Sequence, residues 1–115
     1  MPTPAEVEAF LREYQTRMRV FDVLFRDDRE KNTATLAVLG ISRDQRKQVL
    51  RELSVADYSD GPITDWDGGP ALWVFGKVLK GTDLYIKVTL GFTRTGDVLC
   101  ISFHAAEHPM KFPLR

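Results

Sequence analysis

Three segments in the last half of the sequence alternate between aliphatic residues and a mixture of aromatic, basic and hydroxyl residues. Successive side chains on a β-strand point to opposite faces, so the alternation predicts three strands of one sheet. The aliphatic face would consist of Leu72, Val74, Val78, Leu84, Ile86, Val88, Leu90, Leu99, Ile101 and Phe103. The second face would consist of Trp73, Phe75, Lys77, Tyr85, Lys87, Thr89, Cys100, Ser102 and His104. This second face lacks carboxylates and offers hydrogen-bond donors, aromatic rings and an imidazole. We therefore predict that it is a functional surface and not merely a solvent-exposed one.

The first half of the sequence has the signals of three helices. Thr3 and Glu6 form a capping box around Pro4, and apolar residues then recur at helical spacing. A short apolar run over 20–25 favours a strand. Further helices are predicted over 33–39, which ends at Gly40, and from the capping residue Ser42 to about residue 52.

The segment 57–70 is rich in aspartate, glycine and proline, and it predicts a loop that contains a short strand near 63–66. Helices come first and strands last, which favours an α+β fold over a doubly wound one. We therefore predict a single domain over residues 1–115, in which a curved antiparallel sheet carries the N-terminal helices on its aliphatic face.

Composition limits the compartment and the partners. The 115 residues include one cysteine, Cys100, so no disulfide can form within the chain, and its apolar surroundings predict a buried thiol in a reducing compartment. We find no signal-peptide pattern and no apolar stretch of membrane-spanning length, and we expect a soluble, cytoplasmic protein that does not bind membranes. Six bases stand against three acids from Ala71 onward, so a polyanion, if one is bound, would lie against the C-terminal strands.

His104 is the first candidate for chemistry, because histidine transfers protons near neutral pH. Tyr85 and Lys87 would share its face and could bind and stabilise a phosphate. Trp73, Phe75 and Lys77 interleave rings with a cation, a pattern on which single-stranded bases can stack. The alternatives are that His104 only bonds a loop carbonyl, and that the rings pack under a loop or against a protein partner.

Metal and cofactor signals are weak. The aspartates at 57, 60, 65 and 67 lack the spacing of a calcium loop and fit turn chemistry instead. His104 and His108 lie four residues apart, but Pro109 follows and no acid or cysteine cluster joins them, so zinc is not expected. The sequence also lacks a phosphate-binding glycine loop, a dinucleotide fingerprint and a nucleophile elbow. We therefore expect no metal and no cofactor.

Several short motifs occur in a recognisable order: Leu39-Gly40-Ile41, then 53–58 with the sequence Leu-Ser-Val-Ala-Asp-Tyr, then the Trp73–Lys77 segment, Gly81, Leu84-Tyr85-Ile86-Lys87, and 98–104 ending in Ser-Phe-His. In this order and spacing the chain resembles the toxins of the motility quorum-sensing regulator family (MqsR-like), over roughly residues 26–104. The resemblance implies a RelE-like fold and a role in a type II toxin–antitoxin pair. It also implies metal-independent cleavage of messenger RNA and a cognate antitoxin, which we expect to be a helix-turn-helix protein.

The resemblance assigns roles to individual residues. Tyr85 matches a catalytic tyrosine and Lys87 the lysine two residues later, while His104 stands where a better-known member has a catalytic lysine. We expect Trp73, Phe75, Lys77 and His108 to contact single-stranded RNA. The alternative is a non-catalytic module that binds a protein or RNA, with Trp73, Phe75 and Tyr85 as its docking face. An RNA site should lose affinity as salt rises, and an aromatic docking face should not.

Overall fold

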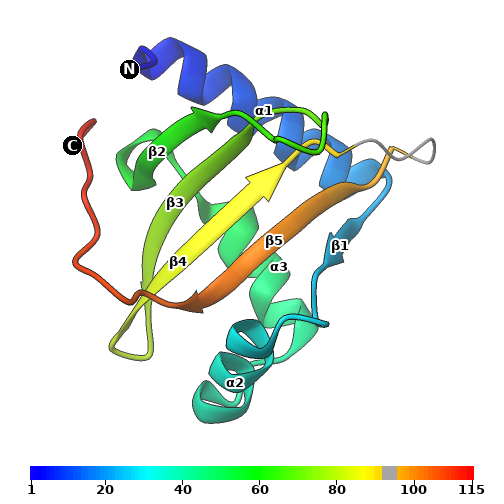
Figure 1. Ribbon diagram of the computed structural model, residues 1–115, viewed down its shortest axis with the longest axis vertical. Helices are drawn as coiled ribbons and strands as arrows, with labels where there is room; N and C mark the ends of the chain where they lie inside the picture. Colours follow the sequence, from blue (N-terminus) through cyan, green and yellow to red (C-terminus); the bar gives the residue numbers. More distant parts are fainter. Residues whose placement is uncertain (92–95) are drawn as a thin grey trace.

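The computed structural model describes residues 1–91 and 96–115, and these form a five-stranded sheet flanked by helices (Figure 1). The helices are α1 (Pro4–Val20), α2 (Glu30–Leu39), α3 (Arg43–Glu52) and the 3-10 turn η1 (Val55–Asp57). The strands are β1 (Val23–Phe25), β2 (Tyr58–Ile63), β3 (Leu72–Leu79), β4 (Thr82–Thr89) and β5 (Val98–Ala105). The α+β class is confirmed, and every described strand except β1 follows the helices in the chain.

The sheet is mixed rather than wholly antiparallel. The strand order is β1-β5-β4-β3-β2, and the neighbours from β2 to β5 are antiparallel. At the other edge β1 runs parallel to β5, with Val23 beside Val98 and Phe25 beside Cys100. A tight hairpin forces two strands to be antiparallel, whereas β1 meets β5 only after most of the chain has intervened. The antiparallel prediction is therefore wrong at this edge.

The helix ends follow the sequence signals closely. Thr3 and Glu6 form the expected capping box of α1, and Ser42 and Gln45 form that of α3. Gly40 caps α2 in the left-handed conformation, with φ of 63°. The start of α2 lies earlier than predicted, at Glu30, and its N-cap makes no side-chain hydrogen bond. Within the described residues, no helix is long and apolar enough to cross a membrane.

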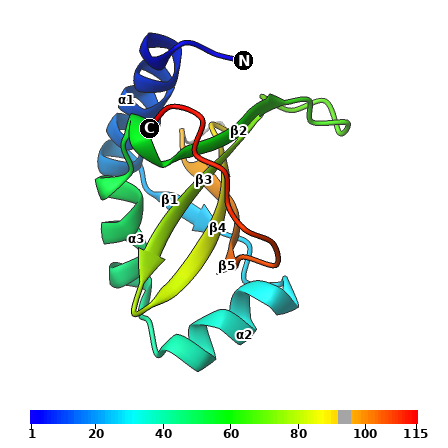
Figure 2. The same ribbon diagram turned by 90° about the vertical axis from the view of Figure 1, so that its left-hand side faces the viewer.

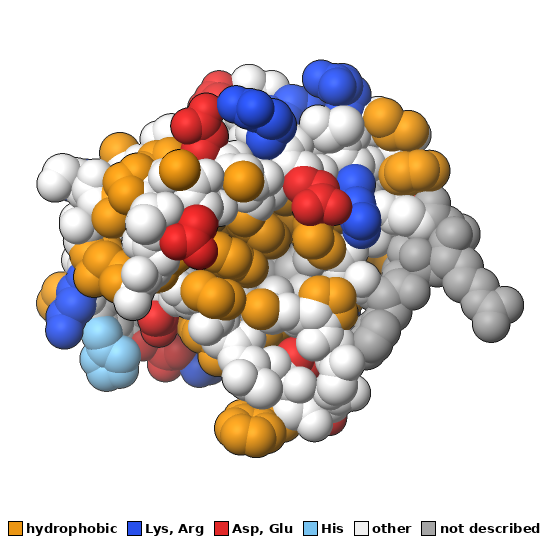
Figure 3. All heavy atoms as spheres, turned by 90° about the horizontal axis from the view of Figure 1, so that it is seen from above, with side chains coloured by type: hydrophobic (Ala, Val, Ile, Leu, Met, Phe, Trp, Pro, Cys, Tyr) orange, Lys and Arg blue, Asp and Glu red, His pale blue; other side chains and the backbone are white. Residues whose placement is uncertain are grey.

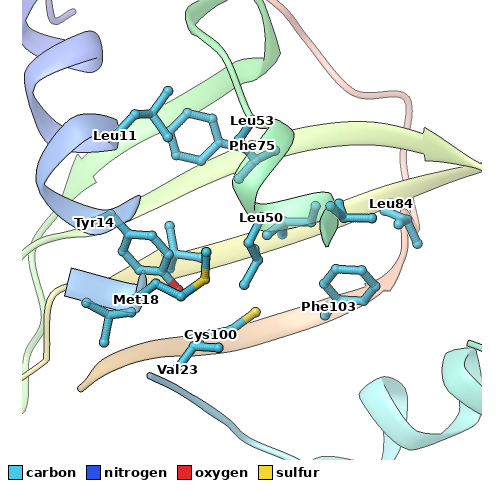
Figure 4. Packing of buried hydrophobic residues seen from close by; sticks show 14 of the residues in the cluster. Leu11, Tyr14, Met18, Val23, Leu50, Leu53, Phe75, Leu84, Cys100 and Phe103 are labelled. Carbon is cyan, nitrogen blue, oxygen red and sulfur yellow. The ribbon is translucent and has the colours of Figure 1, made fainter. Parts of the chain in front are cut away.

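The hydrophobic core lies between the sheet and two of the helices. Figure 2 shows α1 and α3 on one side of the sheet, with α2 at its lower end. Buried side chains of α1, including Leu11, Tyr14 and Met18, meet Leu50 and Leu53 from the α3 region over the strands (Figure 4). The Tyr14 hydroxyl donates to the Leu99 carbonyl oxygen at 3.0 Å, so its polar atom is satisfied. This core fixes which face of the sheet is left for function.

The residues of β3 face the opposite way from the sequence prediction. Trp73 pairs with Val88 and Phe75 with Ile86, so both rings lie on the core side. Phe75 is fully buried, and Trp73 stacks on Phe10 with 4.6 Å between ring centroids. Because residues 72–75 are all apolar, alternation does not show which of them face the core. The register of the β3–β4 hairpin decides this instead. Val74 and Gly76 therefore lie on the face of Tyr85 and Lys87.

A bulge in β5 divides its residues between the two faces. Lys87 pairs with Ser102 but Val88 pairs with Cys100, so Ile101 is the extra residue. Cys100 consequently joins Phe103 in the core, and both are about 1% exposed. Burial raises the pKa of the Cys100 thiol, which fits the predicted inert role. Ser102 and His104 remain on the second face, as predicted, while the placement of Cys100 there is wrong.

The segment predicted as a loop over 57–70 contains strand β2, which lies before the predicted position rather than at 63–66. Its pairing with β3 is interrupted by two irregularities around Asp60. Turn-forming residues within an irregular edge strand conceal it from a search for alternation. Trp66 lies in the loop after β2 and is 93% exposed.

Helix α2 closes the edge of β5 where β1 ends. Asn32 is 2% exposed, and its amide nitrogen donates to the carbonyl oxygens of Arg26 and Ile101, at 2.9 and 3.0 Å. Its amide oxygen accepts from the Phe103 N–H, and the Thr35 hydroxyl accepts from the Ala105 N–H, both at 3.0 Å. These side chains take the place of a neighbouring strand, so the edge has few groups left to pair with another chain.

Residues 106–115, here called the strap, follow β5 and cross the face of the sheet opposite α1 and α3. The Ala106 N–H donates to the Asp83 carbonyl oxygen at 2.8 Å. At its other end, Arg115 Nε donates to the Ala56 carbonyl oxygen in η1 at 3.1 Å. Figures 1 and 2 show the strap leaving β5, passing β3 and ending near η1. The strap and α2 thus stand on two sides of the open face.

Candidate active site

The open face of the sheet holds a pocket of about 970 Å³. Its walls are residues 29–32 at the start of α2 and residues 107–111 of the strap. Its floor consists of Ser59, Asp60, Val74, Tyr85, Lys87, Ser102 and His104. The volume is in the range of small-molecule sites in proteins, so the pocket can hold part of a chain ligand rather than a whole folded partner.

Tyr85 and His104 form the centre of the floor. They are directly opposite each other on β4 and β5, and their rings stack with centroids 5.2 Å apart and planes 16° apart. The Lys87 ammonium lies on the same face, 5.8 Å from the centroid of the Tyr85 ring. The three residues predicted to be catalytic are thus brought together by the β4–β5 register.

The hydrogen bond of His104 fixes its tautomer. Nδ1 lies 2.9 Å from the Ala105 carbonyl oxygen. A carbonyl oxygen only accepts, so Nδ1 carries the hydrogen and the neutral ring has its lone pair on Nε2. His104 therefore bonds a backbone carbonyl, as its structural alternative required, but that of its neighbour Ala105 in β5 and not that of a loop. The same bond holds the ring with Nε2 free to accept a proton. Both roles of His104 are compatible in this geometry.

The environment keeps Tyr85 protonated. Burial raises the pKa of the Tyr85 phenol, and the nearby Asp60 carboxylate raises it further. At neutral pH the hydroxyl is therefore a neutral hydrogen-bond donor and not a phenolate. Such a donor suits a phosphate oxygen that gains negative charge.

The charges around the pocket are mixed: the floor holds both the cation Lys87 and the carboxylate of Asp60, and both walls carry cations and acids. Lys31 of α2 forms an ion pair with Glu107 of the strap, and this contact lowers the pKa of Glu107. Among the described residues, no ion pair engages Lys87 or Lys111, so both ammonium groups are available to a phosphate. The described residues also contain no cluster of three or more histidine, cysteine or acidic side chains that could hold a metal ion.

Three predicted RNA-contacting residues lie elsewhere. Trp73 and Phe75 are part of the core side, as described above, and Lys77 shares that side because it pairs with Leu84. The Lys77 ammonium donates to the Asp57 carboxylate at 3.0 Å and lies 3.4 Å from the Glu52 carbonyl oxygen. The prediction that these residues share a face with Tyr85 is wrong, and a docking face of Trp73, Phe75 and Tyr85 is excluded with it. His108, by contrast, lines the pocket.

Several pocket residues are not among the predicted site residues. Asp60 fits turn chemistry in the sequence, and the start of α2 and the strap residues Met110 and Lys111 lie outside the predicted set. Gly76 was the available signal, because an isolated glycine in a strand often marks the close approach of another segment. A Cβ on Gly76 would lie 2.8 Å from the Phe112 ring.

Comparison with known proteins finds no matching family model, no similar curated protein and no similar solved structure.

Proposed function

We propose that this protein is a metal-independent endoribonuclease that cleaves single-stranded RNA by attack of a ribose 2′-hydroxyl. The observation that carries the proposal is the stacked pair of Tyr85 and His104, with Lys87 beside it, on the floor of a pocket. Metal-free RNA cleavage needs a base for the 2′-hydroxyl and donors or cations for the charged phosphorane. In this proposal His104 supplies the base, Tyr85 the hydrogen-bond donor and Lys87 the cation.

In the proposed reaction, His104 Nε2 removes the proton of the 2′-hydroxyl. The 2′-oxygen then forms a bond to phosphorus, and the bond from phosphorus to the 5′-oxygen breaks. The Lys87 ammonium and the Tyr85 hydroxyl stabilise the negative charge on the phosphorane oxygens. The leaving 5′-oxygen takes a proton from water, and the hydroxide left behind takes the proton from His104, which restores the neutral ring. The products are a 2′,3′-cyclic phosphate and a 5′-hydroxyl.

The biological role follows the resemblance to MqsR-like toxins. We propose that the chain is the bacterial toxin of a type II toxin–antitoxin pair, an mRNA interferase with a RelE-like fold that acts in the cytoplasm. A cognate antitoxin, a helix-turn-helix protein, would be its inhibitory partner. The mixed sheet, with helices α1 and α3 on one face and a polar pocket on the other, supports this reading of the fold.

The test is cleavage of a labelled single-stranded RNA by the purified protein with a metal chelator present. We expect His104→Ala to slow cleavage about 10²–10⁴-fold. Tyr85→Phe, which removes one donor, should slow it about 10²-fold. Arg19→Gln is the control, because Arg19 is an exposed cation of α1 that does not line the pocket. Equal rates for all four proteins would refute the assignment of the site.

The second candidate is a non-catalytic binding module. Trp66 favours it, because a ring that is 93% exposed between Asp65 and Asp67 is suited to a basic protein partner rather than to RNA. This candidate predicts no cleavage by any of the proteins. It also predicts partner binding that is lost in Trp66→Ala and is retained in His104→Ala.

A further inference from the structure

The strap forms one wall of the pocket, and its position has a consequence for the substrate. Resting on the proposed function, we propose that the strap is the specificity element of the RNA site. Docked on Gly76, it provides the wall against which one unpaired nucleotide beside the scissile phosphate binds. The site therefore accepts single-stranded RNA and rejects duplex RNA.

Contacts at both ends hold the strap in place. Near its start, Glu107 pairs with Lys31 of α2, which links the two walls of the pocket. At its end, the Arg115 guanidinium lies 3.7 Å from the centroid of the Phe112 ring and also bonds η1. Leu114 packs against the hydrophobic core. A segment that is tied at three places is a fixed part of the site.

The middle of the strap rests directly on Gly76. A Cβ at this position would lie 2.8 Å from Phe112 Cζ, closer than side-chain carbons approach one another, and 3.0 Å from Met110 Cε. Gly76 is on β3, opposite Tyr85 on β4. The missing side chain therefore lets the strap lie close to the sheet next to the Tyr85–His104 pair. A larger residue here would displace the Phe112 ring and the Met110 methyl group from the sheet.

The strap presents chemistry that suits one nucleotide. Met110 offers a polarisable apolar surface to a base, and His108 and Lys111 can bind its phosphates. An A-form duplex keeps its bases paired and stacked, and side chains cannot enter its deep major groove. A duplex cannot therefore place a single nucleotide between the strap and the floor, whereas an unpaired strand can splay one base into that space.

The experiment measures binding separately from cleavage. Fluorescence anisotropy gives the affinity of the protein for a 2′-O-methyl RNA, which lacks the attacking hydroxyl, as a single strand and as a duplex. The variants are Gly76→Ala, which places a methyl group under the ring, and Phe112→Ala, which removes the ring. Phe21→Ala is the matched control, because Phe21 also covers a glycine, Gly96, but outside the pocket. Thermal unfolding confirms that each variant is folded, and trypsin cleavage after Lys111 reports strap release.

We expect the wild type to prefer the single strand and both variants to bind it about tenfold more weakly, as for loss of one base contact. The double variant should be no weaker than either single variant, because both changes break the same contact. Trypsin should cut both variants faster than the wild type and Phe21→Ala. Duplex binding should be unchanged throughout.

The outcomes separate the two proposals. If the wild type binds single strands through the strap but does not cleave RNA, the proposed reaction fails and the strap inference stands. If the wild type cleaves RNA while strap release leaves single-strand affinity unchanged, the strap inference fails and the reaction stands. A wild type that binds and cleaves neither form of RNA would overturn both.

Discussion

The alternation of side chains along β3 and β4 gives two lysines opposite roles. Lys77 points to the core side and holds the carboxylate of Asp57, which is 7% exposed, whereas Lys87 lies on the pocket floor. Removing the cationic donor of a buried carboxylate destabilises the fold, whereas removing an exposed cation that faces a pocket does not. The same residue type therefore serves stability on one strand and, in the proposed reaction, phosphate binding on the next.

The pair Lys77→Met and Lys87→Met tests this division. Lys77→Met should lower the free energy of unfolding by about 1–2 kcal/mol, because the Asp57 carboxylate loses a charged donor. It should leave the rate of RNA cleavage per folded molecule unchanged. Lys87→Met should do the reverse, with cleavage slowed and stability within about 0.5 kcal/mol of the wild type. Urea unfolding and cleavage rates measure both effects, and a slower reaction in Lys77→Met would contradict the role given to it.

Tyr14 should make stability depend on pH in the alkaline range. Burial raises the pKa of its phenol well above the ordinary value of 10.0, and Cys100 adds a smaller effect. A raised pKa in the folded state means that this contribution is complete below pH 10 and is lost as pH rises toward the folded value. Tyr14→Phe removes the titration together with the bond to the Leu99 carbonyl oxygen.

We therefore expect Tyr14→Phe to be less stable than the wild type by about 0.5–1.5 kcal/mol at pH 7. Its stability should then fall less steeply between about pH 9 and 11. Urea unfolding at a series of pH values measures both quantities. Stability curves that stay parallel across this range would show that ionisation of Tyr14 does not contribute.

At the scale of elements, α2 depends on Asn32 to hold the edge of β5. Replacing this amide with a carboxylate in Asn32→Asp would place negative charge beside the carbonyl oxygens of Arg26 and Ile101. We expect the free energy of unfolding to fall by about 2–4 kcal/mol, since two buried bonds are lost. Thr33→Asp adds the same charge at a neighbouring exposed site and should change stability by about 0.5 kcal/mol or less. A stable Asn32→Asp protein in urea unfolding would mean that α2 is held elsewhere.

The elements that sequence patterns predicted best are those with explicit end signals. The capping boxes of α1 and α3 and the terminal Gly40 of α2 place these helices to within a few residues. Strand faces were harder. The phase of β3 depends on a hairpin register, and that of β5 changes at the bulge residue Ile101. Neither is visible in local alternation, because both are settled by the partner strand.

For the whole molecule, the sheet separates the hydrophobic core from the proposed active site. The face toward α1 and α3 buries the core, and the other face is left to the pocket between α2 and the strap. Seen from above, hydrophobic, acidic and basic side chains lie side by side, and no single charge dominates this end (Figure 3). The neutral net charge of the chain therefore gives little indication of a nucleic-acid partner, and the local cations of the pocket matter more.

The candidate site was predictable where it depends on two adjacent strands. Tyr85, Lys87 and His104 lie on β4 and β5, whose alternation is clear around these residues. The walls could not be predicted, because they come from a helix start and from the strap, which are distant in sequence and lack periodicity. Gly76 on β3 does give a sign of the strap wall in the sequence. A residue without a side chain is needed at this position only because the strap lies on it.

The most direct measurement is the chemistry of the ends that the protein produces from a single-stranded RNA, with chelator present. Mass spectrometry should find 2′,3′-cyclic phosphates and 5′-hydroxyls from the wild type, and at least about 10²-fold less from His104→Ala over the same time. The same sequence made entirely with 2′-O-methyl ribose should stay intact, because its attacking hydroxyl is blocked. Fragments with 3′-hydroxyl ends, cleavage of the methylated strand, or equal cleavage by His104→Ala would contradict a 2′-hydroxyl attack at the Tyr85–His104 pair.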